Sequence, residues 1–160
     1  MSNTKKCNSS MQLTRAADYA VRVMVCLAQI PQDERVLLPA ISHATAAPES
    51  FLSKVLQGLA RAKLINSRRG PAGGFQISAR GRKASMREVI EAIDGPINLN
   101  ICLPEKRSCP RKAWCPAHPV WVKAQEALVN VLDGALIVDL ATNAYPSLPM
   151  LVERRTGTGD

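Results

Sequence analysis

Three cysteines lie close together in the second half of the chain, and thiols are the side chains best suited to bind a soft metal. They follow the order Cys102-x6-Cys109-x5-Cys115, and His118 stands just beyond them. Three thiolates and an imidazole are typical ligands of an iron–sulfur cluster or of zinc. Zinc sites usually take cysteines in closely spaced pairs, which this segment lacks. The pattern therefore favours an iron–sulfur cluster, and redox-active or plain surface thiols are the alternative.

The redox state of these thiols depends on the compartment. The chain has five cysteines, an odd number, and its first ten residues lack the apolar core and cleavage site of a secretory signal. Its apolar runs also fall far short of the roughly 20 residues that a membrane-spanning helix needs. We therefore expect a cytoplasmic protein with reduced thiols and no membrane partner.

Charge indicates the kind of partner. The chain has 21 basic and 13 acidic residues, a net charge of +8. A stretch without any acid contains eight of the basic residues: Arg61, Lys63, Arg68, Arg69, Arg80, Arg82, Lys83 and Arg87. Such a stretch suits the phosphate backbone of DNA. With two histidines and no nucleophile–base pattern, we do not expect an enzyme.

The elements before the cysteines resemble a DNA-reading unit. Hydrophobic spacing predicts a helix from Thr14 to before Pro31 and a short helix over 39–45. After a tight turn at 46–47, Pro48 is expected at the first position of a third helix. One side of that helix is apolar, formed by Phe51, Leu52, Val55, Leu56 and Leu59. The opposite side carries the candidate DNA contacts Ser50, Ser53, Lys54 and Gln57.

Two strand-like pieces, 64–68 and 74–78, surround a turn rich in Gly and Pro and predict a hairpin. Arg69 at its tip is expected to enter a minor groove, and the neighbouring Arg68 is a further candidate DNA contact. Ser85 and Glu88 form a capping-box pattern that starts another helix, and Gly95 ends it. The fold class is therefore mainly α with a small β-hairpin: a winged helix-turn-helix, a cysteine-rich loop and a long dimerisation helix.

The dimerisation helix is expected beyond the proline-rich loop 96–118. Apolar residues there alternate at spacings of three and four, as in a coiled-coil seam: Trp121, Ala124, Leu128, Val131 and Ala135. We therefore divide the chain into a disordered extension (1–10), a winged helix-turn-helix domain (11–83), a linker helix, cluster loop and dimerisation helix (84–141), and a mobile tail (142–160).

Several segments together resemble the IscR/NsrR family of winged-helix regulators, also called the Rrf2 family. They are 11–20, 50–56, 67–75 and 91–95, followed by the three cysteines. The resemblance implies a homodimeric transcription regulator, with Cys102, Cys109 and Cys115 as cluster ligands. It implies His118 as fourth ligand, with Asp18 of the other subunit as the alternative. Ser53 stands where IscR has a glutamate that discriminates between DNA sites.

The expected function is a repressor of a palindromic operator on double-stranded DNA, with a [2Fe-2S] cluster favoured over [4Fe-4S]. The cluster would sense iron, cluster supply, oxidants or nitric oxide. A thiol-based repressor without metal is the alternative from the same fold, and an iron–sulfur electron carrier is the alternative from another class.

Overall fold

The computed structural model of this chain describes residues 13–71, 73–104 and 109–143. Its elements in chain order are α1 (Arg15–Ala28), α2 (Leu38–Thr45), α3 (Glu49–Arg61), β1 (Ile65–Arg68), β2 (Gly74–Ile77), α4 (Ala79–Arg82), α5 (Met86–Asp94), α6 (His118–Gly134) and α7 (Ile137–Thr142). The expected fold class, mainly helical with one antiparallel hairpin, is confirmed. None of the described helices has the length and hydropathy needed to traverse a bilayer. The expected extension 1–10 and nearly all of the expected tail lie outside the described residues.

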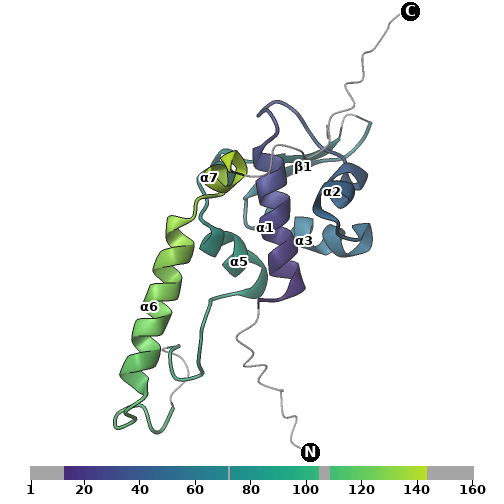
Figure 1. Ribbon diagram of the computed structural model, residues 1–160. Helices are drawn as coiled ribbons and strands as arrows, with labels where there is room; N and C mark the ends of the chain where they lie inside the picture. The colour runs from purple at the N-terminus through teal and green to yellow at the C-terminus, as the bar shows by residue number, and fades with distance from the viewer. Residues whose placement is uncertain (1–12, 72, 105–108, 144–160) are drawn as a thin grey trace, which may run out of the picture.

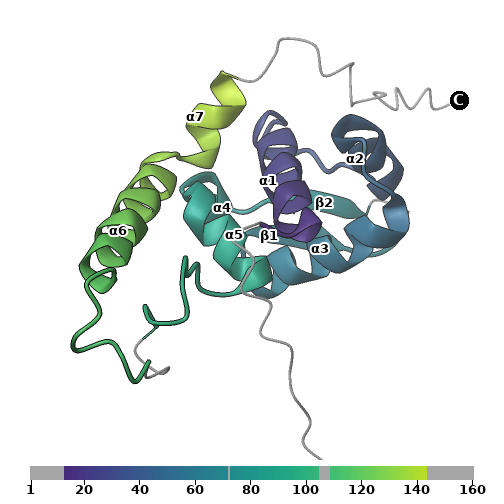
Figure 2. The same cartoon turned by 60° about the horizontal axis from the view of Figure 1, so that its bottom comes forward.

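Helix α1 is the centre of the hydrophobic core. Its inner face buries Ala20, Val23, Met24 and Leu27 completely or almost so, and α2, α3, α5 and α7 all pack against it (Figures 1 and 2). The helix begins as the sequence predicts, because the Thr14 hydroxyl accepts a hydrogen bond from the backbone N–H of Ala17. This packing fixes the position of α3 relative to the rest of the molecule.

The turn between α2 and α3 differs from the prediction by one residue. Ala46 takes up a left-handed conformation, with φ 52° and ψ 38°. Pro48 is the N-cap, and Glu49 is the first residue of α3. Proline, which has no N–H, is accepted both at the N-cap and at the first helical position. The N–H of any residue at these positions has no partner within the helix. The helix-turn-helix itself forms as expected.

The hairpin pairs Ile65 with Ile77 at its base and Arg68 with Gly74 near its tip. Each strand is one residue shorter than predicted, although the Ser78 N–H still donates to the Leu64 carbonyl at 3.0 Å. Val36 adds a single bridge to the outer side of β2. The hairpin is thereby tied to the segment between α1 and α2.

The second half of the molecule contains a long helix that stands apart. Helix α5 has the predicted capping box at Ser85 and ends at Gly95. Helix α6 extends from the cysteine loop along one side of the molecule (Figure 1), and none of its residues is buried. The short helix α7, which the sequence did not predict, buries Ile137 and Ala141 against the core. It connects the far end of α6 back to α1.

Candidate DNA-binding surface and cysteine loop

The predicted reading helix presents its polar side to solvent. Leu52, Leu56 and Leu59 of α3 are almost completely buried, whereas Ser50, Lys54 and Gln57 are exposed. Ser53 is partly buried, and its hydroxyl donates to the Glu49 carbonyl at 3.0 Å. Ser50, Lys54 and Gln57 are therefore placed to meet a ligand, while Ser53 already has an internal partner.

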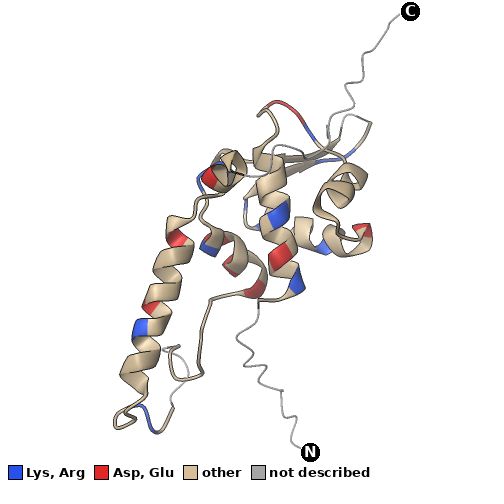
Figure 3. Ribbon diagram, viewed as in Figure 1, with Lys and Arg blue, Asp and Glu red and all other residues tan. Residues whose placement is uncertain are grey.

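Not every basic residue after α3 is available to DNA. Arg82 donates to the Ala28 and Ile30 carbonyls, at 3.1 and 2.8 Å, and joins the end of α1 to α4. Arg80 donates to the Ala62 carbonyl at 2.7 Å, although the residue itself is exposed. Arg87 pairs with acids on α5 and α6. The remaining five side chains of the basic stretch are exposed: Arg61, Lys63, Arg68, Arg69 and Lys83. Figure 3 shows where basic and acidic residues lie along the elements.

Phe51 departs from the predicted core. Its side chain remains 39% exposed, and its ring meets Tyr19 of α1 edge to face, with centroids 5.5 Å apart and an interplanar angle of 74°. The Arg22 guanidinium in turn lies over the Tyr19 ring, 5.7 Å from its centre. Helical periodicity placed Phe51 on the apolar side, but it lies at the edge of that side and next to Ser50. Sequence reasoning therefore missed a large apolar group on the reading helix.

The three predicted cluster ligands occupy a series of turns before α6. Cys102 is 8% exposed, and Cys109 and Cys115 are half-buried. The backbone N–H of His118 donates to the Cys115 carbonyl at 3.1 Å, so His118 follows the third cysteine by one turn. Its Nδ1 atom is buried and has no hydrogen-bond partner among the described residues.

These donors are not gathered in the described structure. Among residues 13–104 and 109–143, no three His, Cys, Asp or Glu side chains lie close enough to hold a metal ion. Neither His118 nor Asp18 therefore joins two of the thiols within one chain. Asp18 instead pairs with Arg22 across one helical turn, at 2.8 Å, with both side chains about half exposed. This is the ordinary surface ion pair that its i, i+4 spacing allows.

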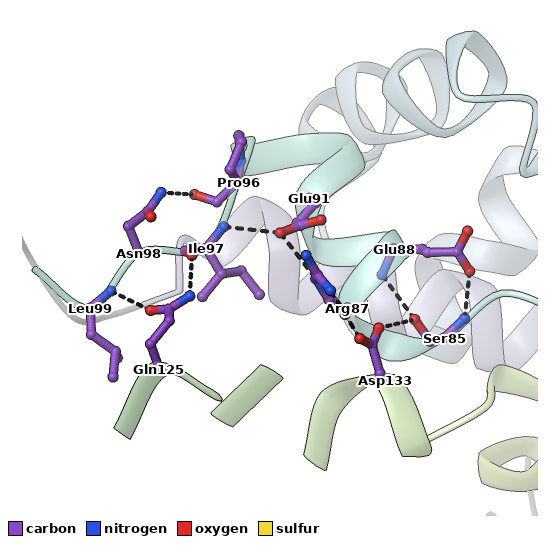
Figure 4. Close-up of polar contacts among 10 residues, drawn as sticks. All are labelled: Ser85, Arg87, Glu88, Glu91, Pro96, Ile97, Asn98, Leu99, Gln125 and Asp133. Carbon is purple, nitrogen blue, oxygen red and sulfur yellow. Dashed lines mark hydrogen bonds and ion pairs between the residues drawn. The ribbon is translucent and has the colours of Figure 1, made fainter. Parts of the chain in front are cut away.

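Polar contacts connect α6 at one place to the loop after α5 and at another to the start of α5 (Figure 4). Toward the loop, Gln125 Nε2 donates to the Ile97 carbonyl at 2.6 Å, and its Oε1 accepts from the Leu99 N–H at 2.9 Å. Toward α7, Asp133 accepts from Arg87 at 2.9 Å and from the Ser85 hydroxyl at 3.3 Å. Hydrogen bonds raise the pKa of the Arg87 side chain above its ordinary value; the bond with Asp133 has the largest effect, and the bond with Glu91 comes second.

Between these two contacts lies an apolar groove of about 570 Å³. Ile90 of α5 and Ile97 of the following loop line one side, and three members of the predicted seam, Trp121, Ala124 and Leu128, line the α6 side. Val131 of the same seam points elsewhere and is 72% exposed. The seam is therefore divided between the groove and the solvent-exposed face of α6.

A helix-turn-helix followed by a hairpin, with a polar exposed face on its last helix, defines the winged-helix class of DNA-binding proteins. The family model described as Rrf2, iron-dependent transcriptional regulator, matches residues 13–143. The chain therefore belongs to the Rrf2 family of transcriptional regulators. This confirms the expected regulator and identifies a family that is not enzymatic.

Similar proteins support this assignment. The HTH-type regulator ORF2 of Azotobacter vinelandii is 32% identical over 150 residues, covering 93% of this chain and 91% of its own. The IscR regulator of Aliivibrio salmonicida is 29% identical over 130 residues, covering 81% and 77%. Two solved structures share the fold of this chain; each is 22% identical to it in sequence and aligns with 84% of its residues. CymR, the global cysteine regulator of B. subtilis, has a TM-score of 0.68 over 98% of its chain, and T. potens IscR has 0.66 over 88%.

Proposed function

We propose that this regulator is a cytoplasmic homodimer that represses transcription from a palindromic operator and senses its signal through an iron–sulfur cluster. The observation that carries the proposal is the exposed polar side of α3, which leads within a few residues into a hairpin with exposed Arg68 and Arg69. A helix of this kind fits the major groove and a basic wing fits the adjacent minor groove.

The donor set of the loop fits an iron–sulfur cluster. Cys102, Cys109 and Cys115 supply soft ligands, and the buried, unpartnered Nδ1 of His118 is a suitable fourth donor within the described residues. Asp18 is a weaker candidate because Arg22 already engages its carboxylate. When bound, a cluster supplies reversible redox chemistry and sensitivity to iron, oxidants or nitric oxide, and we favour [2Fe-2S] over [4Fe-4S].

One observation favours a second candidate, a repressor in which the thiols are oxidised without metal. The described thiols are free and do not form a group that could hold a metal within one chain. Protein purified without air distinguishes the two. The cluster proposal expects a coloured protein with acid-labile sulfide, and loss of colour in Cys102→Ala, Cys109→Ala or Cys115→Ala. Colourless protein that retains regulated DNA binding would favour the thiol-based alternative, and stoichiometric zinc would contradict both.

The DNA-binding proposal is tested by two variants that should differ in their salt dependence. Arg69→Ala should lower operator affinity by about 1–3 kcal/mol and reduce the salt dependence by about one charge per protomer. Ser50→Ala should change preference at particular base pairs and leave the salt dependence unchanged. Both effects are measured by titrating a selected operator at several salt concentrations. Wild-type affinity of Arg69→Ala at every salt concentration would show that the hairpin is not a DNA wing.

The homodimer is supported by the lack of buried residues on α6. Val120 and Val131 of this helix are 66% and 72% exposed, and exposed apolar surface of this kind marks an interface. We expect sedimentation to show a dimer at micromolar concentration and Val131→Asp to weaken it. Because Val131 is exposed within its own chain, the substitution does not disturb the protomer core. A monomeric wild type would contradict the proposal.

A further inference from the structure

We propose that Phe51 determines part of the DNA specificity of this regulator by contacting the methyl group of a thymine in the major groove. The proposal rests on the proposed DNA-binding function of α3. It adds a base-reading role for a side chain that the sequence had placed in the core.

The first step is the position of the ring. Phe51 follows the exposed Ser50 directly and lies three residues before the exposed Lys54, at the edge of the polar side of α3. It is the third residue of the helix, and reading helices use their N-terminal residues to contact base edges. With 39% of its surface open, the ring contributes an apolar area to an otherwise polar surface.

The second step is that the ring is held in place. Tyr19 supports it edge to face at 5.5 Å, and the Arg22 guanidinium covers Tyr19 at 5.7 Å. Arg22 is itself paired with Asp18 at 2.8 Å. Because one side of the Phe51 ring is packed on α1, the exposed side has a fixed direction and need not be ordered on binding.

The third step is the choice of ligand. Among the groups that base pairs present in the major groove, the thymine C5-methyl is the apolar one, and apolar side chains such as phenylalanine contact it. Lys54, exposed three residues further along α3, adds a cation to this surface, and a cation suits a polyanion better than an apolar protein surface. The chemistry therefore points to thymine rather than to a partner protein.

The test removes only the methyl group. The wild-type dimer is first used to select its preferred sequence from a pool of random duplexes of about 30 base pairs, long enough for two half-sites. We expect a thymine at one position of each half-site. Replacing both with uracil should weaken binding about fourfold per methyl group, the value of one buried methyl. Unchanged affinity after uracil replaces every selected thymine would overturn the proposal.

Variants then assign the effect to the ring. Phe51→Ala should bind the thymine and uracil duplexes equally, and Phe51→Leu should retain part of the difference. The matched control is Val138→Ala on α7, because Val138 is 38% exposed and lies outside the reading helix. It should discriminate as the wild type does. If Phe51→Ala keeps the thymine preference but dissociates the dimer in sedimentation, Phe51 is a protein contact and the proposal is wrong. If the wild type selects no sequence at all, the DNA-binding function fails as well.

Discussion

Burial separates Cys26 of the core from two cysteines of the loop, Cys109 and Cys115. Cys26 is 2% exposed on the inner face of α1, and desolvation raises the pKa of its thiol to about 11. Burial has this effect because the charged thiolate is less stable away from water. Cys109 and Cys115 lie half-buried on the loop. A thiol reagent therefore encounters an inert core residue and accessible loop residues in the same molecule.

We expect iodoacetamide to modify Cys109 and Cys115 of the metal-free protein at neutral pH and to leave Cys26 unmodified. The thiolate is the nucleophile, and the raised pKa keeps Cys26 protonated until the pH approaches 11. Peptide mass spectrometry after timed alkylation measures this order. Denaturant should make Cys26 reactive. Equal rates for Cys26 and Cys115 in the folded protein would show that α1 opens readily.

Residue types were easier to interpret from the sequence than residue environments. The cysteine spacing and the polar side of α3 were visible as patterns. The internal roles of Arg80 and Arg82 were not, because their partners are backbone carbonyls far away in the sequence, such as Ala62 and Ala28. Phe51 was misplaced for a related reason. Periodicity gives the direction of a side chain from its helix axis, while exposure at the edge of a face depends on what packs there.

At the scale of elements, the longer helices were the ones predicted, and the short helices α4 and α7 were not. Helix α5 has a complete capping box, in which the Ser85 hydroxyl accepts from the Glu88 N–H while the Glu88 carboxylate accepts from the Ser85 N–H. Helix α7 has no side-chain cap and only six residues. The packing of Ile137 against the core stabilises α7, and no local sequence pattern predicts that packing.

Ser85→Ala should lower the free energy of unfolding by about 1–2 kcal/mol, the cost of losing an N-cap. The hydroxyl also donates to Asp133, so the variant loses a contact between α5 and α6 as well. Chemical denaturation measures the difference. Ser53→Ala is the control, because the Ser53 hydroxyl is exposed and bonds only within its own helix; it should change stability by less than about 0.5 kcal/mol. Equal losses of unfolding free energy in both variants would mean that the Ser85 cap stabilises the protein no more than the Ser53 hydroxyl does.

The whole molecule has two parts with different sources of stability. The helix-turn-helix, the hairpin, α5 and α7 share one hydrophobic core around α1. Helix α6 is connected to this body by polar contacts at Gln125 and Asp133 and by the groove residues between them. The sequence predicted both parts, since apolar periodicity indicates the main helices α1, α3 and α6. It could not show that part of the α6 seam faces α5, because that depends on how α7 turns the chain back to α1.

The lack of buried residues along the 17 residues of α6 has a consequence for backbone amide exchange. In proteins most of a helix's stability comes from tertiary packing rather than from intrinsic propensity. If a second protomer supplies that packing, the deuterium uptake of α6 should slow as protein concentration rises, because association shifts the population toward the protected state. Amides of α1, which is buried within its own chain, should exchange at a rate independent of concentration. Mass spectrometry of deuterated peptides at two concentrations would measure both, and concentration-independent uptake in α6 would mean that one chain stabilises this helix alone.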